Sequence, residues 1–221
     1  MPKRRIKIKL WIDEVGRGPW AGPVVACAVV FHPKNKPSSK FLKQLTDSKK
    51  LTQKKRDKLY KELVLMSIWN KPQLFFGIGV VDNFIIDEIN IRQANKEAMR
   101  RAILEADRKV QSSFSSNEDV IIQAFIDGRD NYKFEELEEP AVFIVGGDSK
   151  VREISAASII AKVFRDKLMK QYATLYPQYG FETNVGYGTK KHQEQLKNPP
   201  DITGIHRVSY KPIKVVLEKN N

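Results

Sequence analysis

The first predicted strand of this chain ends in two adjacent acids, and this feature constrains the fold strongly. Apolar and polar residues alternate over 6–12, which predicts a β-strand with one buried face. Asp13 and Glu14 follow directly, and a glycine-flanked turn begins at Gly16. Unpaired buried carboxylates cost more than a fold gains from them, so these must be solvated, ion-paired or bound to metal. The pattern suggests a divalent-metal site beside a loop whose backbone can hold phosphate.

Two further acids stand where predicted strands end. Asp127 ends a strand expected over 120–127, and Asp148 follows a Gly-Gly pair after a short strand expected over 142–145. Each of these two acids alone is more often an ordinary turn residue, because Asp-Gly and Gly-Gly-Asp are common turn sequences. Three acidic strand ends together favour a site for Mg²⁺ or Mn²⁺, which prefer oxygen ligands. Such a site suits two-metal hydrolysis of a phosphodiester.

Strand and helix patterns alternate along the rest of the chain. The other expected elements are strands over 22–31 and 73–81 and helices over 52–68, 83–111 (in two pieces around Asn90), 152–172 and 189–197. Strands interleaved with helices predict an α/β fold in which helices pack on a mixed sheet.

The chain carries a large excess of positive charge. Its 221 residues include 39 Lys and Arg against 26 Asp and Glu, a formal net charge of +13 at pH 7. This excess favours a polyanionic partner, with simple solubility as the alternative. Lys49, in the loop before the helix over 52–68, is a candidate phosphate contact. Tyr187 lies between two glycines and is either a stacking surface for a sugar or base or a core aromatic.

Cysteine content and hydropathy indicate the compartment. The single cysteine, Cys27, lies in an apolar run, where we expect it to be a core residue, and it cannot form an intrachain disulfide. This suits a reducing environment. No apolar run approaches the ~20 residues that cross a bilayer. We therefore expect a cytoplasmic protein that does not engage membranes.

Eight segments of this chain resemble those of ribonuclease HII, the bacterial type 2 ribonuclease H. They are DEVGRGPWAGPVVACAVV, DSKKLT, INIRQANKEAMRRAI, IDG, GGDSKVREISAASIIAKVFRD, YPQYGF, GYGTKKH and IHRVSY. The segments occur in the family's order from residue 10 to about residue 213. The sister type, ribonuclease HIII, is less similar, because it tends to have Gly-Thr-Gly where this chain has Gly-Arg-Gly.

The resemblance implies a fold and an activity. The fold is an RNase H-like mixed β-sheet flanked by helices, with a catalytic domain over 1–176 and a C-terminal substrate-binding helical extension over 177–221 packed on it. The activity is metal-dependent endonucleolytic cleavage of RNA in RNA/DNA hybrids and at ribonucleotides in duplex DNA. The cut falls on the 5′ side of the ribonucleotide and leaves 3′-hydroxyl and 5′-phosphate ends, with a role in removing ribonucleotides from DNA.

The same resemblance assigns residues. The family's catalytic, metal-binding acids fall on Asp13, Glu14, Asp127 and Asp148, which are expected to hold two Mg²⁺ or Mn²⁺ ions during catalysis. The substrate-binding residues fall on Gly16, Arg17 and Gly18 in the loop, on Ser48 and Lys49, and on the junction-reading Tyr187. We expect a monomer, and a protein partner from DNA replication is left open.

Three other functions compete with this interpretation. A DNA junction resolvase of the same superfamily would not need the Gly-Arg-Gly loop or Tyr187. A nucleic-acid-binding module without catalysis would not need four intact acids. A structural protein of the ribosome would explain the charge but not the acids at strand ends.

Overall fold

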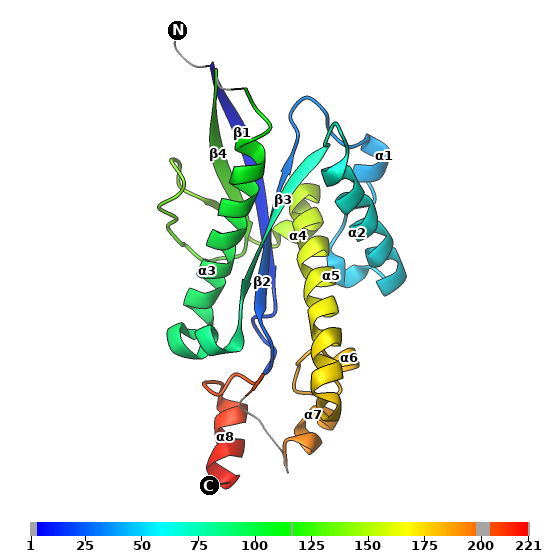
Figure 1. Cartoon of the computed structure of the whole chain (residues 1–221), viewed down its shortest axis with the longest axis vertical. Helices are drawn as coiled ribbons and strands as arrows, with labels where there is room; N and C mark the ends of the chain where they lie inside the picture. The colour runs from blue at the N-terminus through cyan, green and yellow to red at the C-terminus, as the bar shows by residue number, and fades with distance from the viewer. Residues whose placement is uncertain (1–3, 116, 198–203, 221) are drawn as a thin grey trace.

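A five-stranded mixed sheet forms the centre of the molecule, with helices on both faces (Figure 1). The computed structural model describes residues 4–115, 117–197 and 204–220. The strands are β1 (Arg4–Val15), β2 (Val24–Phe31), β3 (Leu74–Val81), β4 (Glu118–Asp127) and β5 (Val142–Ile144). The helices are α1 (Ser39–Leu42), α2 (Gln53–Ile68), α3 (Asn83–Gln111), α4 (Gly147–Lys150), α5 (Arg152–Leu175), α6 (Phe181–Asn184), α7 (Lys190–Gln195) and α8 (Lys211–Asn220), with 3₁₀ turns η1 (Ser48–Lys50) and η2 (Pro177–Tyr179).

The strand order is β3-β2-β1-β4-β5, with β1 in the middle. β1 and β2 form an antiparallel hairpin around the glycine loop, and β2 pairs antiparallel with β3. β4 instead pairs parallel to β1, and β5 pairs parallel to β4. The sheet is therefore mixed, as the sequence and the family resemblance predict.

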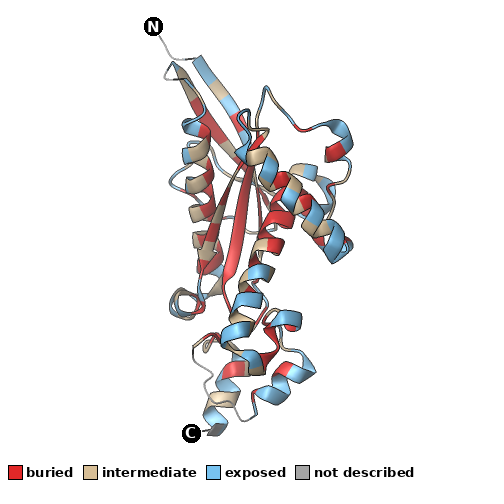
Figure 2. Cartoon of the chain, turned by 45° about the vertical axis from the view of Figure 1, so that its right-hand side comes forward, coloured by how far each residue is buried: buried red, intermediate tan, exposed pale blue. Residues whose placement is uncertain are grey.

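The two faces of the sheet are covered by different helices, and β2 shows why. All eight residues of β2 are buried, because both faces of this strand are covered. Val24, Ala26, Ala28 and Val30 pack in the cluster that contains the apolar face of α3. Cys27, Val29 and Phe31 pack in the cluster formed with α2 and α5. Buried residues accordingly run along the central strands (Figure 2), and Cys27 is confirmed as a core residue.

Helix α3 lies unusually close to β3, and two glycines make this approach possible. A Cβ atom on Gly79 would lie 1.8 Å from the carbonyl oxygen of Ala98, and one on Gly77 would lie 2.2 Å from that of Ala102. Neither position accepts a larger residue without displacing the helix. The close packing of α3 on β3 therefore depends on both the alanines of this helix face and the two glycines of the strand.

The outer edge of β3 is closed by side chains of α3. An edge strand otherwise offers unpaired backbone groups to other chains. Three polar side chains, one helical turn apart, bind these groups: Arg101 Nη1 donates to Val80 O (2.7 Å), Lys109 Nζ donates to Phe76 O (2.8 Å), and Glu105 Oε2 accepts from Ile78 N (2.7 Å). The edge is thus satisfied within the chain.

The C-terminal part packs on the end of α5 that lies far from the N-terminus (Figure 1). Its small core joins residues from several segments: Ala21, Met169, Tyr179, Phe181, Leu196, Ile205 and Ile213. Because Ala21 belongs to the glycine loop and Met169 to α5, this core connects the C-terminal part to both. The predicted extension over 177–221 includes residues 198–203 and 221, which lie outside the described residues.

The expected elements agree with the structure to within a few residues. The predicted break near Asn90 is confirmed: this residue has φ 64° and ψ 162° inside α3, and its side chain accepts hydrogen bonds from the N–H groups of Arg92 and Gln93. The short helices α1, α4 and α6 and the helix α8 were not predicted. Helices α1, α4 and α6 span only four residues each, so local sequence carries little signal for them. Helix α8 does carry a signal, because Ile213, Val216 and Leu217 recur at helical spacing and pack in the C-terminal core.

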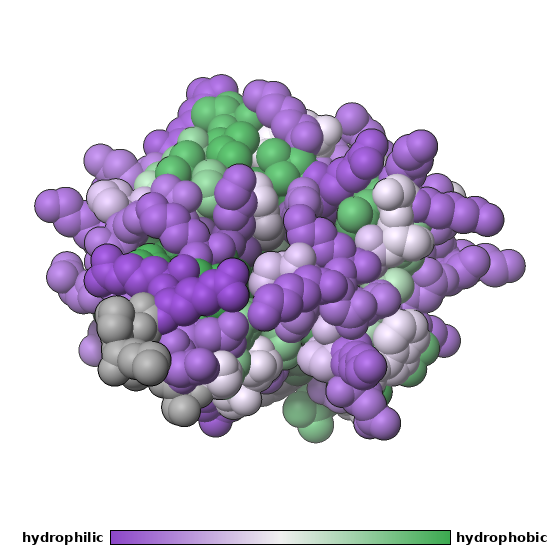
Figure 3. All heavy atoms as spheres, turned by 90° about the horizontal axis from the view of Figure 1, so that it is seen from above, coloured by the Kyte–Doolittle hydropathy of each residue, from purple (hydrophilic) through white to green (hydrophobic). Residues whose placement is uncertain are grey.

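The surface at the N-terminal end is mostly hydrophilic, with hydrophobic side chains in small areas (Figure 3). None of the helices in the described part of the chain has the length and apolar character that a membrane span requires.

Replacing Gly79 by alanine should destabilise the fold. The added methyl group meets the backbone of α3, and overpacking of this kind typically costs about 1–3 kcal/mol. We expect the urea midpoint to fall accordingly. Gly18→Ala is the matched control, because a Cβ there would meet only Tyr187 at an ordinary 3.6 Å. Equal stability of the two variants would contradict the close packing described here.

Candidate metal and nucleic-acid site

Three predicted acids meet at one end of the sheet. β1 and β4 pair in parallel with Ile12 opposite Ile126, so the next residues, Asp13 and Asp127, lie side by side where the pairing of these two strands ends. α4 brings Asp148 to the same place. Carboxylate oxygens of these three acids all lie within 4.8 Å of one another. Residues more than a hundred positions apart in the sequence therefore form one group, which we call the carboxylate group.

The carboxylate group is unfavourable without a cation. Burial raises the pKa of Asp13 well above its usual range, and the negative charges of Glu14 and Asp127 raise it further. Burial and then the charge of Asp127 also raise the pKa of Asp148. Opposing effects exist, since Asp13 accepts hydrogen bonds from Ser158 and from the Glu14 N–H. The folded protein thus holds these acids close together against their mutual repulsion.

Glu14 points toward a different set of partners. Its side chain lies 3.6 Å from Nη1 of Arg17, and the same nitrogen donates to Asp130 at 3.1 Å. Burial raises the pKa of Glu14 to about 7; Arg17 lowers it and Asp127 raises it. Glu14 stands outside the carboxylate group, because neighbouring residues of a strand project to opposite faces. The charge of Asp127 nevertheless raises the pKa of Glu14.

Local structure around α4 and η1 fixes the rim of the group. The N–H of Gly147, at the start of α4, donates to Asp127 Oδ1 at 2.6 Å. On the opposite side, Lys49 Nζ lies 3.7 Å from Asp148 Oδ2 and is otherwise exposed. The hydroxyl of Ser48 is buried and lies 2.9 Å from that of Ser158 on α5. Lys49 thus reaches the acids, whereas Ser48 holds η1 against α5.

The carboxylate group fits a divalent cation. Its donors are oxygen atoms only, they converge within ligation range of one centre, and burial with repulsion leaves them in need of positive charge. Hard divalent cations such as Mg²⁺, Mn²⁺ and Ca²⁺ take oxygen donors of this kind. Lys49 and Arg17 supply part of that charge at the rim.

The Gly-Arg-Gly loop is held from below by two buried arginines, Arg165 and Arg207, which are both 0% exposed. Arg207 donates to the carbonyl oxygens of Gly16, Arg17 and Gly22 at 2.6–3.0 Å. Arg165 on α5 donates likewise to three carbonyl oxygens, those of Ala21, Pro23 and Val185, at 2.8–3.1 Å. Burial, and then the charge of Arg207, lowers the pKa of Arg165 to about 10. A Cβ on Gly16, at φ +95°, would lie 2.3 Å from Arg165 Nε.

This arrangement orients the peptide groups of the loop. In a trans peptide the C=O of one residue and the N–H of the next point in opposite directions. The carbonyls of Gly16 and Arg17 face Arg207, so the N–H groups of Arg17 and Gly18 face away from it. Within the described residues, no acceptor binds these two N–H groups. The loop therefore offers two backbone donors on its outer side.

Tyr187 lies against this loop. The residue is 45% exposed, and a Cβ on Gly18 would meet its ring at 3.6 Å. Below the ring, the carbonyl of Tyr187 accepts a hydrogen bond from Nδ1 of His192 at 2.9 Å, and Nε2 of His192 lies 2.9 Å from Nε2 of His206. Because a carbonyl only accepts, Nδ1 of His192 carries a proton. A buried histidine pair therefore holds the backbone of Tyr187, whose side chain is exposed.

The residues on the surface of this site are predicted from the sequence, whereas the residues that support them are not. Arg165, Arg207 and Tyr210, whose hydroxyl donates to Arg17 O at 2.6 Å, received no role. Their signal was present, because Arg207 and Tyr210 stand in the segment IHRVSY and Arg165 in the long segment around α5. Polar residues in these segments could have suggested a buried polar contact, but their partners in the glycine loop lie more than a hundred residues away.

Comparison with known proteins identifies relatives along nearly the whole chain. A family model described as Ribonuclease HII matches residues 10–213. The chain is 43% identical over 208 residues to a ribonuclease HII from Endomicrobium trichonymphae, covering 94% of this chain and 87% of that protein. It is 41% identical over 209 residues to a ribonuclease HII from Ligilactobacillus salivarius, covering 94% and 71% of the two.

A solved structure is similar as well. The ribonuclease H2 from Pyrococcus horikoshii OT3 superposes with a TM-score of 0.67 at 26% identity, over 96% of this chain and 98% of that chain. The RNase H-like fold predicted from the sequence is thereby confirmed.

Removal of the Asp13 charge should stabilise the cation-free protein at alkaline pH. A carboxyl whose pKa is raised on folding contributes stability below its unfolded pKa, and this stability is lost as the pH rises through the folded pKa. At pH 8, with chelator present, Asp13→Asn should therefore raise Tm by at least about 2 °C, the shift that 1 kcal/mol produces at this size. The gain should shrink toward pH 4.

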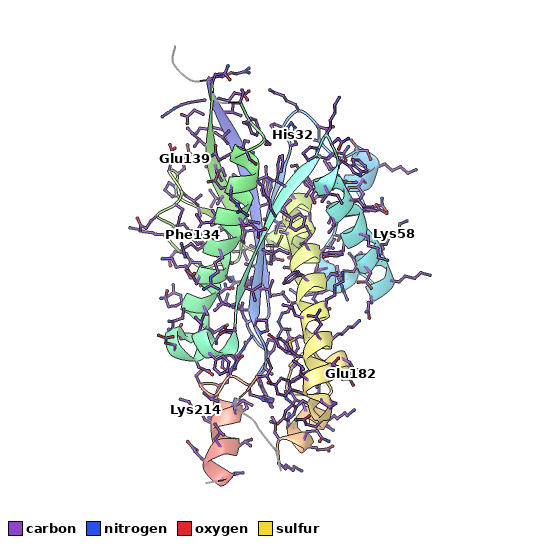
Figure 4. All side chains as sticks on the ribbon, in the orientation of Figure 1. His32, Lys58, Phe134, Glu139, Glu182 and Lys214 are labelled. Atoms are coloured by element: carbon purple, nitrogen blue, oxygen red, sulfur yellow. The ribbon has the colours of Figure 1, made fainter. Side chains whose placement is uncertain are left out.

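The matched control is Glu182→Gln, which removes one exposed negative charge on α6, at the C-terminal end of the molecule (Figure 4). A pH-independent change, equal in both variants, would show that net charge alone is responsible.

Proposed function

This chain belongs to the ribonuclease HII family, and we propose that it is a divalent-metal-dependent endoribonuclease acting on RNA/DNA hybrids and on ribonucleotides embedded in duplex DNA. The observation that carries the proposal is the convergence of Asp13, Asp127 and Asp148 at the end of paired parallel strands. A non-catalytic binding module would retain these acids only at a cost in stability, because they repel one another.

We assign the catalytic and metal-binding roles to Asp13, Glu14, Asp127 and Asp148. Three of them form the carboxylate group. Glu14 lies beside it, where the negative charge of Asp127 raises the pKa of Glu14. Bound divalent ions supply positive charge to the scissile phosphate and acidify the attacking water. The side chains themselves position these charges and keep the end of the sheet polar.

Recognition of the ribonucleotide is assigned to the loop and to Tyr187. The 2′-hydroxyl distinguishes RNA from DNA at a given position. The outward N–H groups of Arg17 and Gly18 are donors of the kind that can bind its oxygen, and the hydroxyl of Tyr187 is a further candidate. The exposed ring of Tyr187 suits the next sugar, which would favour a junction between RNA and DNA.

Binding of the nucleic-acid phosphates that are not cleaved is assigned to basic side chains near α2. Lys49 lies at the carboxylate group, and Ser48 fixes the turn that carries it. Further lysines lie exposed on α2, and Lys58 projects from the outer side of this helix (Figure 4). With a net charge of +13, we expect binding that is independent of sequence and weakens with salt.

We propose the following reaction. Water attacks the phosphate on the 5′ side of a ribonucleotide, the bond to the preceding 3′ oxygen breaks, and 3′-hydroxyl and 5′-phosphate ends remain. The 2′-hydroxyl is recognised but does not attack. Such an activity would begin the removal of ribonucleotides from DNA. We further propose that residues 177–221 form a substrate-binding extension of a catalytic domain over 1–176, because Tyr187 lies in that part.

The deciding experiment maps a cut. A duplex with one ribonucleotide is incubated with the protein and Mg²⁺ or Mn²⁺, beside an all-DNA four-way junction and an all-DNA duplex. We expect one cut, 5′ of the ribonucleotide, in the first substrate alone. Cleavage of the junction but not of the ribonucleotide duplex would support a resolvase instead.

Asp127→Asn should abolish cleavage and leave binding intact. It removes a ligand charge, whereas the asparagine oxygen can still accept from Gly147 N–H. We expect turnover to fall more than about 100-fold, since partners one step further from a metal are already worth 10–100-fold. Affinity for the uncleaved duplex, measured by fluorescence anisotropy, should change little. Near-normal turnover would refute the assignment.

Tyr187→Ala should impair cleavage at a single ribonucleotide about tenfold more than cleavage within a long RNA tract, in keeping with the energy of one stacked base. Tyr187→Phe keeps the ring and tests the hydroxyl separately. Phe84→Ala, which removes another exposed aromatic ring, is the control. Equal losses on both substrates would argue against junction recognition.

A further inference from the structure

Arg17 is shared between two acids with different roles. Its Nη1 donates to Asp130 Oδ2 at 3.1 Å and lies 3.6 Å from Glu14 Oε1. Glu14 is a proposed metal ligand, whereas Asp130 lies outside the carboxylate group. The Arg17 side chain is 42% exposed, so it has room to turn from one acid to the other.

Asp130 is fixed independently of Arg17. Arg92 on α3 places its Nε 3.7 Å from Asp130 Oδ1 and donates through Nη2 to Asn131 at 3.2 Å. The guanidinium of Arg92 also lies 5.8 Å from the ring centre of Tyr132, the next residue in this loop. Asp130 is only 21% exposed in its side chain. Asp130 thus has a second basic partner on α3, in addition to Arg17.

The backbone of Arg17 is fixed too. Its carbonyl oxygen accepts from Nη1 of Arg207 at 3.0 Å and from the hydroxyl of Tyr210 at 2.6 Å. Only the side-chain torsions of Arg17 remain free to change its partner. The choice between Glu14 and Asp130 is consequently made by electrostatics and not by movement of the loop.

A guanidinium on Glu14 opposes a cation at the carboxylate group. With Glu14 as the proposed fourth ligand beside that group, the guanidinium and the cation compete for the Glu14 carboxylate, and two like charges held close together repel each other where water screens them only in part. Moving the Arg17 guanidinium away from Glu14 is favourable only if another acid forms an ion pair with it. Asp130 is that acid, because it already takes the shorter of the two contacts.

We propose that Asp130 is a positioning residue, which draws the Arg17 guanidinium away from Glu14 and thereby raises the affinity of the carboxylate group for divalent cations. The inference rests on the proposed function, since it takes Glu14 as a metal ligand. It adds a residue that touches neither metal nor substrate and acts through Arg17.

The test measures Mn²⁺ binding to the full chain by isothermal titration calorimetry, without substrate. Asp130→Asn should weaken binding about tenfold, the lower end of the range for partners of metal ligands. Asp130→Glu, which keeps the acceptor, should restore most of the affinity. Thermal unfolding with and without Mn²⁺ gives a second readout, because an ion that binds the folded state stabilises it.

A double-mutant cycle separates action through Arg17 from direct attraction between Asp130 and the cation. Arg17→Gln removes the competing guanidinium and should leave Mn²⁺ affinity at or above that of the wild type. In this background, Asp130→Asn should have no further effect. A tenfold loss that persists in the Arg17→Gln background would overturn the inference, because Asp130 would then act on the cation directly.

Glu182→Gln is the charge-matched control and should bind Mn²⁺ as the wild type does. Failure of this inference is distinguishable from failure of the proposed function. A wild-type protein that binds Mn²⁺ and cuts the ribonucleotide duplex, together with an Asp130→Asn variant of equal affinity, overturns the inference alone. A wild type that neither binds nor cuts overturns both.

Discussion

The parallel pairing of β1 with β4 is the contact on which the candidate site depends. It sets Ile12 opposite Ile126 in the core and places Asp13 and Asp127 side by side where this pairing ends. The hydrophobic alternation of both strands fixes this register, because a slip of one residue would bury the polar face of a strand. Packing of the apolar core therefore holds the acids close together despite their mutual repulsion. The proposed cation would offset this repulsion.

A second constraint comes from the buried arginines under the glycine loop. Burying a guanidinium is costly unless its hydrogen bonds are satisfied, and Arg165 and Arg207 satisfy theirs with carbonyl oxygens of the loop. Arginine suits this task better than lysine, since its planar fork reaches several acceptors at once. The same bonds turn the opposite N–H groups outward. The C-terminal segment thus stabilises the loop and shapes its outer surface, so stability and proposed recognition depend on the same residues.

Much of the fold could be predicted from the sequence, because its signals are local. The alternation over 6–12, the continuous apolar run of β2 and the polar break at Asn90 each act through neighbouring residues, and all three predictions agree with the structure. Side-chain contacts between distant segments carry no such signal. The closing of the β3 edge by Arg101, Glu105 and Lys109 and the pairing of His192 with His206 became visible only in the folded chain.

For the candidate site, the sequence by itself determined which residue types stand at the strand ends and that a glycine loop follows the first pair. It thereby determined the oxygen-rich chemistry and the kind of ion that suits it. Only the tertiary structure decided that Asp13, Asp127 and Asp148 converge while Glu14 turns to Arg17 and Asp130. The physical reason is that pairing between β1 and β4 joins segments more than a hundred residues apart, whereas alternation along one strand sends adjacent side chains to opposite faces.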